Sequence, residues 1–386
     1  MNVPRQHHVS EARALHRDAL VIDTHCDTTQ KLVTGRWRFD RRHRRGHVDI
    51  PRLREGGIDA AFFAVFAPAS TAKGHNAAAA RAQIARIRET VARHAAQVAP
   101  AASASDVRAA KAEGKIAVVI AIEGGHLIDE SLDVLRAYRD AGAVYLTLTH
   151  ATHTAWADSS GIHGDPGPRH RGLTSFGRDV VRELNRLGMI VDVSHVSDAT
   201  LRDVLDTSTA PIIASHSSCR AVAPHRRNLS DEMIRAIAAA GGTVQINFCS
   251  VFIDPHHPQP DPHAVHRFLK TGRVPRGWTA GYVTPLEVLV DHFAHALQLV
   301  GPQHVGIGSD FDGVFTLPDG MQDCSMLPNL TAALMARGFG AADLKMILGE
   351  NVLRVMDACR QEARRIQGAP QESADAPRGV ERSITT

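Results

Sequence analysis

The chain has 386 residues, of which 44% are hydrophobic and 22% charged, a composition typical of a folded protein with a substantial core. Its 44 Lys and Arg nearly balance 41 Asp and Glu, and the formal net charge of +3 argues against nucleic acid or an acidic membrane as a partner. Apolar runs are too short for a transmembrane helix, and residues 1–20 lack the apolar core of a signal peptide. We therefore expect a cytoplasmic protein.

Short β-rich apolar runs alternate with helical patterns along the chain. The expected strands cover residues 20–23, 60–66, 116–123, 144–149, 189–193, 211–215, 243–247 and 304–307. Helical patterns lie at residues 77–96, 105–113, 129–140, 174–187, 197–205 and 231–240, and a capping box at residues 284–287 predicts a further helix to about residue 300. This alternation predicts an α/β fold, a (β/α)8 TIM barrel, with a doubly wound open sheet as the main alternative.

Most of the chain is expected to form one domain. Residues 1–366 would be the barrel, and residues 367–386, which are polar without an apolar period, predict a disordered tail. Residues 251–282 are rich in Pro and His and predict a long loop over the active-site face. The basic run at residues 35–46 is interpreted as a solvated loop, with a polyanion site as the alternative.

Two residue types bear on the chemistry. The five cysteines are odd in number and lack CxxC spacing, which argues against a disulfide framework and a thiolate zinc site. The 23 histidines suggest metal or acid/base chemistry, although compositional drift explains most single cases. What drift does not explain is a series of His, Asp and Glu side chains where the expected strands end: His25, Asp27, Glu123, His150, His195, His216 and Asp310.

In a barrel, the carboxyl ends of the strands surround one cavity, so these side chains are expected to converge. Such a set can hold two divalent ions, with a carboxylate bridging them and a hydroxide between them as the nucleophile. A remaining carboxylate can carry the proton of that nucleophile. The pattern therefore predicts metal-assisted hydrolysis.

Nine segments also carry a resemblance to the renal (membrane) dipeptidase family, zinc dipeptidases of the amidohydrolase superfamily. They follow the order of that family at residues 25–27, 46–53, 123–126, 145–150, 192–195, 215–218, 226–228, 308–314 and 349–354. The resemblance implies two Zn²⁺ per chain. His25 and Asp27 would bind one ion, His195 and His216 the other, and Glu123 would bridge them.

The same resemblance implies the catalytic and substrate-binding residues. Asp310 would take a proton from the nucleophile and pass it to the leaving amine. His150 would face the scissile carbonyl and stabilise the oxyanion, and Arg227 would bind the C-terminal carboxylate of a dipeptide. Four further residues near the strand ends are expected to have only supporting or structural roles: Asp23, His126, His153 and Asp312.

The expected function is thus the hydrolysis of dipeptides, including those with a C-terminal D-residue, and the resemblance also implies a homodimer. Two alternatives are open. Another amidohydrolase activity, such as lactam, N-acyl amino acid or phosphoester hydrolysis, could use the same metal centre, since a fold does not determine a substrate. A non-catalytic metal-binding scaffold is disfavoured, because a pure binder has no need of the Asp310 proton shuttle.

Overall fold

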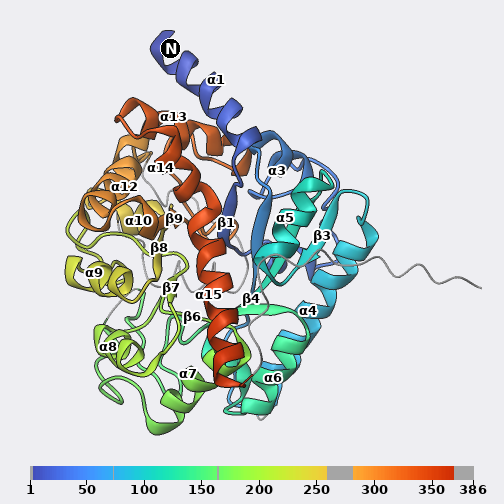
Figure 1. Ribbon diagram of the computed structural model, residues 1–386, viewed down its shortest axis with the longest axis vertical. Coiled ribbons are helices and arrows are strands. Elements are labelled where there is room, and N and C mark those ends of the chain that lie inside the picture. The colour runs from blue at the N-terminus through green and yellow to red at the C-terminus, as the bar shows by residue number, and fades with distance from the viewer. Residues whose placement is uncertain (1–2, 73, 163–164, 259–280, 369–386) are drawn as a thin grey trace, which may run out of the picture.

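The computed structural model describes residues 3–72, 74–162, 165–258 and 281–368, and its centre is a sheet of parallel strands surrounded by helices (Figure 1). The strands are β1 (Ile22–Cys26), β2 (Ala60–Val65), β3 (Val98–Ala101), β4 (Ile116–Glu123), β5 (Ala143–Thr147), β6 (Ile190–Asp192), β7 (Ile213–Ala214), β8 (Thr243–Ile246) and β9 (Val305–Ile307). Their order is β1-β2-β4-β5-β6-β7-β8-β9, and every neighbouring pair is parallel.

Residues at the end of β1 and just beyond β9 bring the two edges of the sheet together. Cys26 and Phe311 form a parallel bridge, and the backbone N–H of Asp27 donates to the carbonyl of Phe311 at 2.8 Å. The strands are buried on both faces, as a sheet with helices outside and packed side chains inside requires. The predicted TIM barrel is confirmed.

Helices follow most of the strands. They are α1 (Val3–Asp18), α2 (Thr29–Leu32), α3 (Ile50–Gly56), α4 (His75–Arg93), α5 (Ala104–Ala112), α6 (Leu132–Asp140), α7 (Ser175–Leu187), α8 (Asp198–Thr207), α9 (Asp231–Ala239), α10 (Ser250–Ile253), α12 (Leu286–Val300), α13 (Leu327–Ala336), α14 (Ala341–Lys345), η4 (Met346–Glu350) and α15 (Asn351–Ile366). Helices α5 to α9 each begin at a Ser or Thr whose side chain accepts a backbone N–H three residues on: Ser103, Ser131, Thr174, Ser197 and Ser230. None of the described helices is both long and apolar enough to cross a bilayer.

The amino-terminal end of the barrel is covered by α15, which crosses the front of the molecule in Figure 1. Gly349 lies so close to β1 that a Cβ there would be 2.5 Å from the carbonyl of Leu20. The Asn351 amide donates to the carbonyls of Pro302 (2.6 Å) and Val305 (2.9 Å). Residues 349–354, one of the nine segments of the resemblance, therefore attach α15 to the barrel.

One strand was not predicted, and two predictions differ from the structure. β3 was not predicted, because its sequence is short and contains Pro100; it pairs only with β4, at an edge where proline is tolerated. β7 has two residues, fewer than the run at 211–215 suggests. The capping box is wrong: α12 begins at Leu286, and its first carbonyl acceptor is that of Pro285.

The reason for the last difference is a distant contact. The carbonyl of Thr284 accepts the backbone N–H of Asp319 at 2.8 Å, so it does not begin the helix. Of the predicted loop at 251–282, residues 259–280 lie outside the described residues, as do residues 369–386 of the predicted tail.

Candidate active site

The carboxyl ends of the barrel strands bring the predicted side chains together. Three groups of His and carboxylate donors, with ligand atoms within 4.8 Å of one another, share members: His25, Glu123 and His216; Glu123, His150 and His195; and His25, Asp27 and Asp310. These residues lie in or directly after β1, β4, β5, β6, β7 and β9. All seven residues predicted from the strand ends therefore meet in one cluster, in which only His150 is partly exposed.

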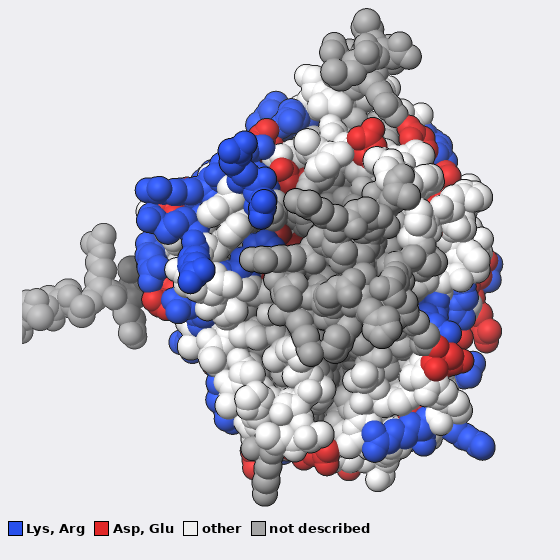
Figure 2. Space-filling model, turned by 180° about the vertical axis from the view of Figure 1, so that it is seen from behind, with Lys and Arg blue, Asp and Glu red and all other residues white. Residues whose placement is uncertain are grey.

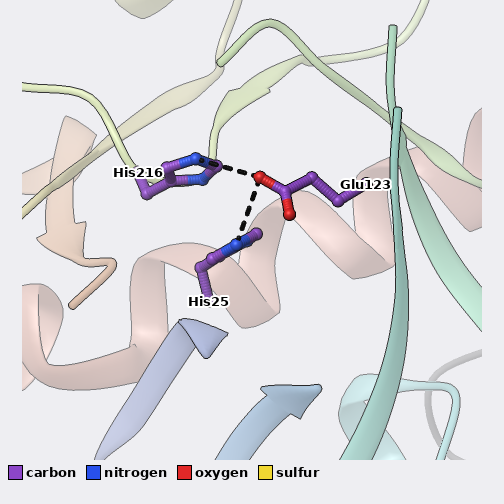
Figure 3. A group of neighbouring side chains, drawn as sticks. All are labelled: His25, Glu123 and His216. Carbon is purple, nitrogen blue, oxygen red and sulfur yellow. Dashed lines mark ion pairs between the residues drawn. The ribbon is translucent and has the colours of Figure 1, made fainter. Parts of the chain in front are cut away.

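Glu123, the last residue of β4, lies at the centre of this cluster. Figure 3 shows the imidazoles of His25 and His216 directed at one oxygen of its carboxylate, Oε1. The Nε2 atoms of His25 and His216 are each 3.5 Å from Oε1, and that of His195 is 3.2 Å away. Burial alone would raise the pKa of Glu123, but the surrounding imidazoles outweigh it and hold that pKa well below its usual range.

Hydrogen bonds determine which ring nitrogen of His25 carries the proton. The Tyr145 hydroxyl donates to the carbonyl of Thr24 (3.1 Å), which can only accept. The same hydroxyl, 2.7 Å from His25 Nδ1, is therefore left to accept from that nitrogen. Nδ1 of His25 therefore carries a hydrogen, and Nε2 is the nitrogen that faces the cluster. Burial lowers the pKa of His25, but Tyr145, Glu123 and Asp27 outweigh it and raise that pKa well above its usual range, so a metal ion at Nε2 would take the place of a proton.

A second chain of hydrogen bonds has the same effect on His216. The Ser215 hydroxyl donates to Asp192 Oδ2 at 2.6 Å and lies 2.8 Å from His216 Nδ1, from which it accepts. His216 Nε2 thus presents a lone pair, 2.9 Å from Nε2 of His195. Burial holds the pKa values of His195 and His216 well below the usual range, so both rings are neutral.

Asp27 and Asp310 form the acidic side of the cluster. Burial raises the pKa of Asp310 to about 8 against the opposing effect of His25, and Asp27 and Glu123 raise it further. Burial and Glu123 likewise raise the pKa of Asp27. The amide of Asn247 donates to Asp310 Oδ2 at 2.9 Å and holds that carboxyl group in position.

His150 lies at the edge of the cluster, and Arg227 lies beside it. His150 Nε2 is 3.7 Å from Glu123 Oε1, and burial lowers the pKa of His150 to about 4, so its ring is a neutral hydrogen-bond donor. Arg227 is buried, and its Nη2 donates to the carbonyl of His216 at 3.1 Å. Its Nε is buried without a hydrogen-bond partner, and its guanidinium lies 5.6 Å from the ring centre of Phe252.

Unusual backbone conformations occur at the same rim. His195, Asp310 and Asp312 have φ values of 68°, 63° and 70°, in the left-handed region that residues other than glycine seldom adopt. Such conformations cost free energy and are typical of functional sites, where the surrounding structure maintains them. They direct the side chains of His195 and Asp310 toward the cluster.

The four residues expected to have supporting roles lie outside the ligand groups. His126 Nε2 is 2.8 Å from the carbonyl of Ala67, and His153 Nδ1 accepts from the backbone of Ser159. The other two hold loops of the rim. The Asp23 carboxylate accepts hydrogen bonds from the backbone N–H groups of His25 and Ser309. The Asp312 carboxylate accepts one from the backbone N–H of His47 and one from the hydroxyl of Thr28.

Sequence reasoning assigned no role to Tyr145, Ser215 or Asn247. Tyr145 lies in the middle of β5, Ser215 and Asn247 directly follow β7 and β8, and Ser215 directly precedes a predicted ligand. A hydroxyl or amide near a strand end can be predicted to form a hydrogen bond with a metal ligand. Which ligand it contacts depends on the neighbouring strand.

The donor set fits a transition metal. His25 Nε2 is fully buried and has no hydrogen-bond partner, which is costly unless another group satisfies it. Imidazole nitrogens with carboxylate oxygens are the ligands that zinc takes at catalytic sites. A parallel barrel with such a cluster at its carboxyl end has the architecture of a metal-dependent hydrolase.

Comparison with known proteins identifies the family. A sequence model of the membrane dipeptidase family, peptidase family M19, matches residues 9–370, and the chain belongs to this family. It is 34% identical over 381 residues to the dipeptidase verJ of Clonostachys rogersoniana, covering 94% of this chain and 90% of that protein. The chain is therefore a dipeptidase of a metallopeptidase family.

Solved structures agree. The probable dipeptidase PvdM of Pseudomonas aeruginosa is similar with a TM-score of 0.80 and 26% identity, covering 92% of this chain and 99% of that one. A metallopeptidase from Rhodobacter sphaeroides, liganded with a phosphinate mimic of the dipeptide L-Ala-D-Ala, has a TM-score of 0.75 and 26% identity, with 88% and 99% covered.

Proposed function

We propose that this dipeptidase holds two Zn²⁺ and hydrolyses dipeptides, including those with a C-terminal D-residue. His25 and Asp27 would bind one ion, His195 and His216 the other, and Glu123 would bridge them. The observation that carries the proposal is the approach of three imidazole nitrogens to one Glu123 oxygen, 3.2–3.5 Å away. When bound, the zinc ions would make a water molecule nucleophilic near neutral pH and polarise the scissile carbonyl.

Asp310 would move the proton. Its carboxylate would accept a proton from the attacking water as the new carbon–oxygen bond forms, and donate it to the leaving nitrogen as the carbon–nitrogen bond breaks. The position of Asp310 supports this role, because its carboxylate lies in one ligand group with His25 and Asp27, and the Asn247 amide holds its Oδ2 in place at 2.9 Å. The products are two free amino acids, so atoms and charges balance.

His150 and Arg227 would bind the substrate. The neutral His150 ring would donate a hydrogen bond to the carbonyl oxygen, where negative charge develops. Arg227, whose Nε lacks a partner, would bind the C-terminal carboxylate. The mimic bound to the Rhodobacter sphaeroides relative motivates a test of C-terminal D-residues.

The experiment for Arg227 compares free dipeptides with C-terminally amidated ones. For Arg227→Ala we expect a KM increase of roughly 100-fold for the free dipeptide and little change for the amide, because charge-assisted pairs contribute a few kcal/mol. The matched control is Arg226→Ala, since Arg226 contacts Ser160 and Asp165 instead. Equal effects on the free and amidated substrates would contradict the carboxylate role.

Asp310→Asn tests the proton role. We expect zinc content, measured by elemental analysis, to stay near that of the unsubstituted protein while kcat falls by roughly 100-fold or more. An active variant would assign the proton transfer to another group.

A library of dipeptides that crosses L- and D-residues at both positions then identifies the preferred substrates.

A further inference from the structure

A basic loop, residues 36–45, carries charge that the fold does not neutralise. All six of its arginines are exposed. Arg38 pairs with Asp40 and Arg42 with Glu55. Among the described residues no ion-pair partner faces the remaining four: Arg36, Arg41, Arg44 and Arg45. Because clustered like charges repel one another, this arrangement costs stability unless an anion is present.

The basic loop lies on the same face as the active site. It belongs to the connection that leaves β1, the strand that carries His25, and its residues come between α2 and α3. Figure 2 shows this face, opposite α15, and Lys and Arg side chains gather at its upper left edge, where α3 lies after the half-turn from Figure 1.

Both ends of the basic loop are attached to the site. At the near end, α2 begins two residues after Asp27. At the far end, the backbone N–H of His47 donates to Asp312 at 2.7 Å, and Asp312 lies two residues after Asp310. Since neighbouring Cα atoms are about 3.8 Å apart, Arg44 and Arg45 lie within about 12 Å of the His47 Cα.

Internal contacts keep the basic loop in this position. Trp37 stacks on His43 with ring centres 3.6 Å apart, and the Lys31 amine lies 5.8 Å from the Trp37 ring centre. The same amine pairs with Asp312 at 3.1 Å. The arginines are therefore presented at the rim by a structured segment, with their charge directed to solvent.

We propose that the basic loop attracts anionic substrates and gives the enzyme a preference for dipeptides with an acidic side chain. The inference rests on the proposed dipeptide hydrolysis. A dipeptide with uncharged side chains is a zwitterion with no net charge, whereas one containing Asp or Glu carries −1. A cluster of positive charge at a cleft raises the local concentration of such an anion, and salt screens the effect.

The test combines four substitutions of the unpaired arginines: Arg36→Gln, Arg41→Gln, Arg44→Gln and Arg45→Gln. At an ionic strength of ~10 mM we expect the KM for Ala-Asp to rise about tenfold with kcat unchanged, because the attraction acts on the approach of substrate and not on the chemistry. The KM for Ala-Ala should change less than about twofold. At ~0.5 M NaCl the difference for Ala-Asp should disappear.

A matched control removes the same charge elsewhere. Arg81, Arg88, Arg202 and Arg235 are exposed on α4, α8 and α9, and their replacement by Gln gives the same net charge. An equal KM change in the control, equal changes for both dipeptides, or no change would overturn the inference. So would binding of heparin by the basic loop without any effect on Ala-Asp, which would indicate a polyanion partner. If the unsubstituted enzyme cleaved neither dipeptide, the proposed function itself would fail.

Discussion

At the scale of single residues, two hydroxyl groups orient the rings of the proposed metal ligands. Tyr145 accepts from Nδ1 of His25, and Ser215 accepts from Nδ1 of His216 because its own hydrogen is directed to Asp192. Each contact leaves Nε2 free to bind a metal ion. Groups of this kind typically change metal affinity by 10- to 100-fold when removed.

Tyr145→Phe is therefore expected to raise the zinc dissociation constant by about 10-fold or more, because His25 loses the acceptor that selects its tautomer. Competition with a chromogenic chelator measures the change. Tyr138→Phe is the matched control, since the Tyr138 hydroxyl is also buried but donates to the carbonyl of Leu127, outside the ligand groups. Equal affinities of the two variants would contradict the orienting role.

Gly313 makes room for the acidic side of the site. A Cβ at this position would overlap the carboxylates of Asp27 and Asp310. For Gly313→Ala we expect weaker zinc binding and a kcat at least about tenfold lower, as displacement of catalytic groups by about 1 Å is costly. Gly340→Ala is the control, because a Cβ there meets no atom within 4 Å and its φ is −79°. Unchanged kinetics of Gly313→Ala would show that the two carboxylates can shift freely.

At the scale of elements, buried histidines join helices away from the site. His16 of α1 contacts the carbonyl of Gly56 in α3 and the hydroxyl of Thr331 in α13, at 2.8 Å in both cases. Burial lowers its pKa from 6.5 to about 4. The ring is therefore neutral in the folded protein at pH values where it would be protonated in the unfolded chain.

This difference predicts a loss of stability in acid. Between pH 6.5 and 4, protons bind His16 in the unfolded chain but not in the folded protein, so the free energy of unfolding decreases as the pH falls through this range. His16 would contribute about 2 kcal/mol of the decrease between pH 7.5 and 5. Urea unfolding should show a smaller decrease for His16→Gln than for the exposed control His75→Gln. An equal decrease would contradict the neutral, buried state.

At the scale of the whole molecule, the barrel places three buried carboxyl groups, Asp27, Glu123 and Asp310, in one cluster. Burying such groups without a cation is costly, so a bound metal is expected to stabilise the fold as well as support catalysis. The homodimer and the cytoplasmic location stay predictions.

Removal of the metal by a chelator is therefore expected to abolish dipeptidase activity and lower the Tm, and added Zn²⁺ should restore both. At a free zinc concentration of about 1,000 times the Kd, the stabilisation would be about 4 kcal/mol. Differential scanning calorimetry measures the shift in Tm. The Glu123→Gln variant is the comparison, and its Tm should rise much less when zinc is added. A Tm indifferent to zinc in the unsubstituted protein would contradict this coupling.

The sequence by itself was sufficient for the fold class and for the seven side chains of the cluster. Strand periodicity is a local property, and a polar residue directly after a strand, such as Glu123 or His216, must lie at the rim of a parallel barrel whatever its neighbours. The same holds for caps such as Thr174, whose partner is three residues away.

Only the tertiary structure decided the features that depend on residues distant in the chain. Helix α12 begins later than predicted because the carbonyl of Thr284 accepts the backbone N–H of Asp319. The barrel closes through the bridge between Cys26 and Phe311. The position of the hydrogen on His25 follows from its contact with Tyr145, 120 residues away. Hydrogen bonds of this kind depend on which distant segments pack side by side, and a local sequence pattern does not contain that information. The cluster could be predicted from strand ends, but its orientation, and the rim position of the basic loop, required the fold.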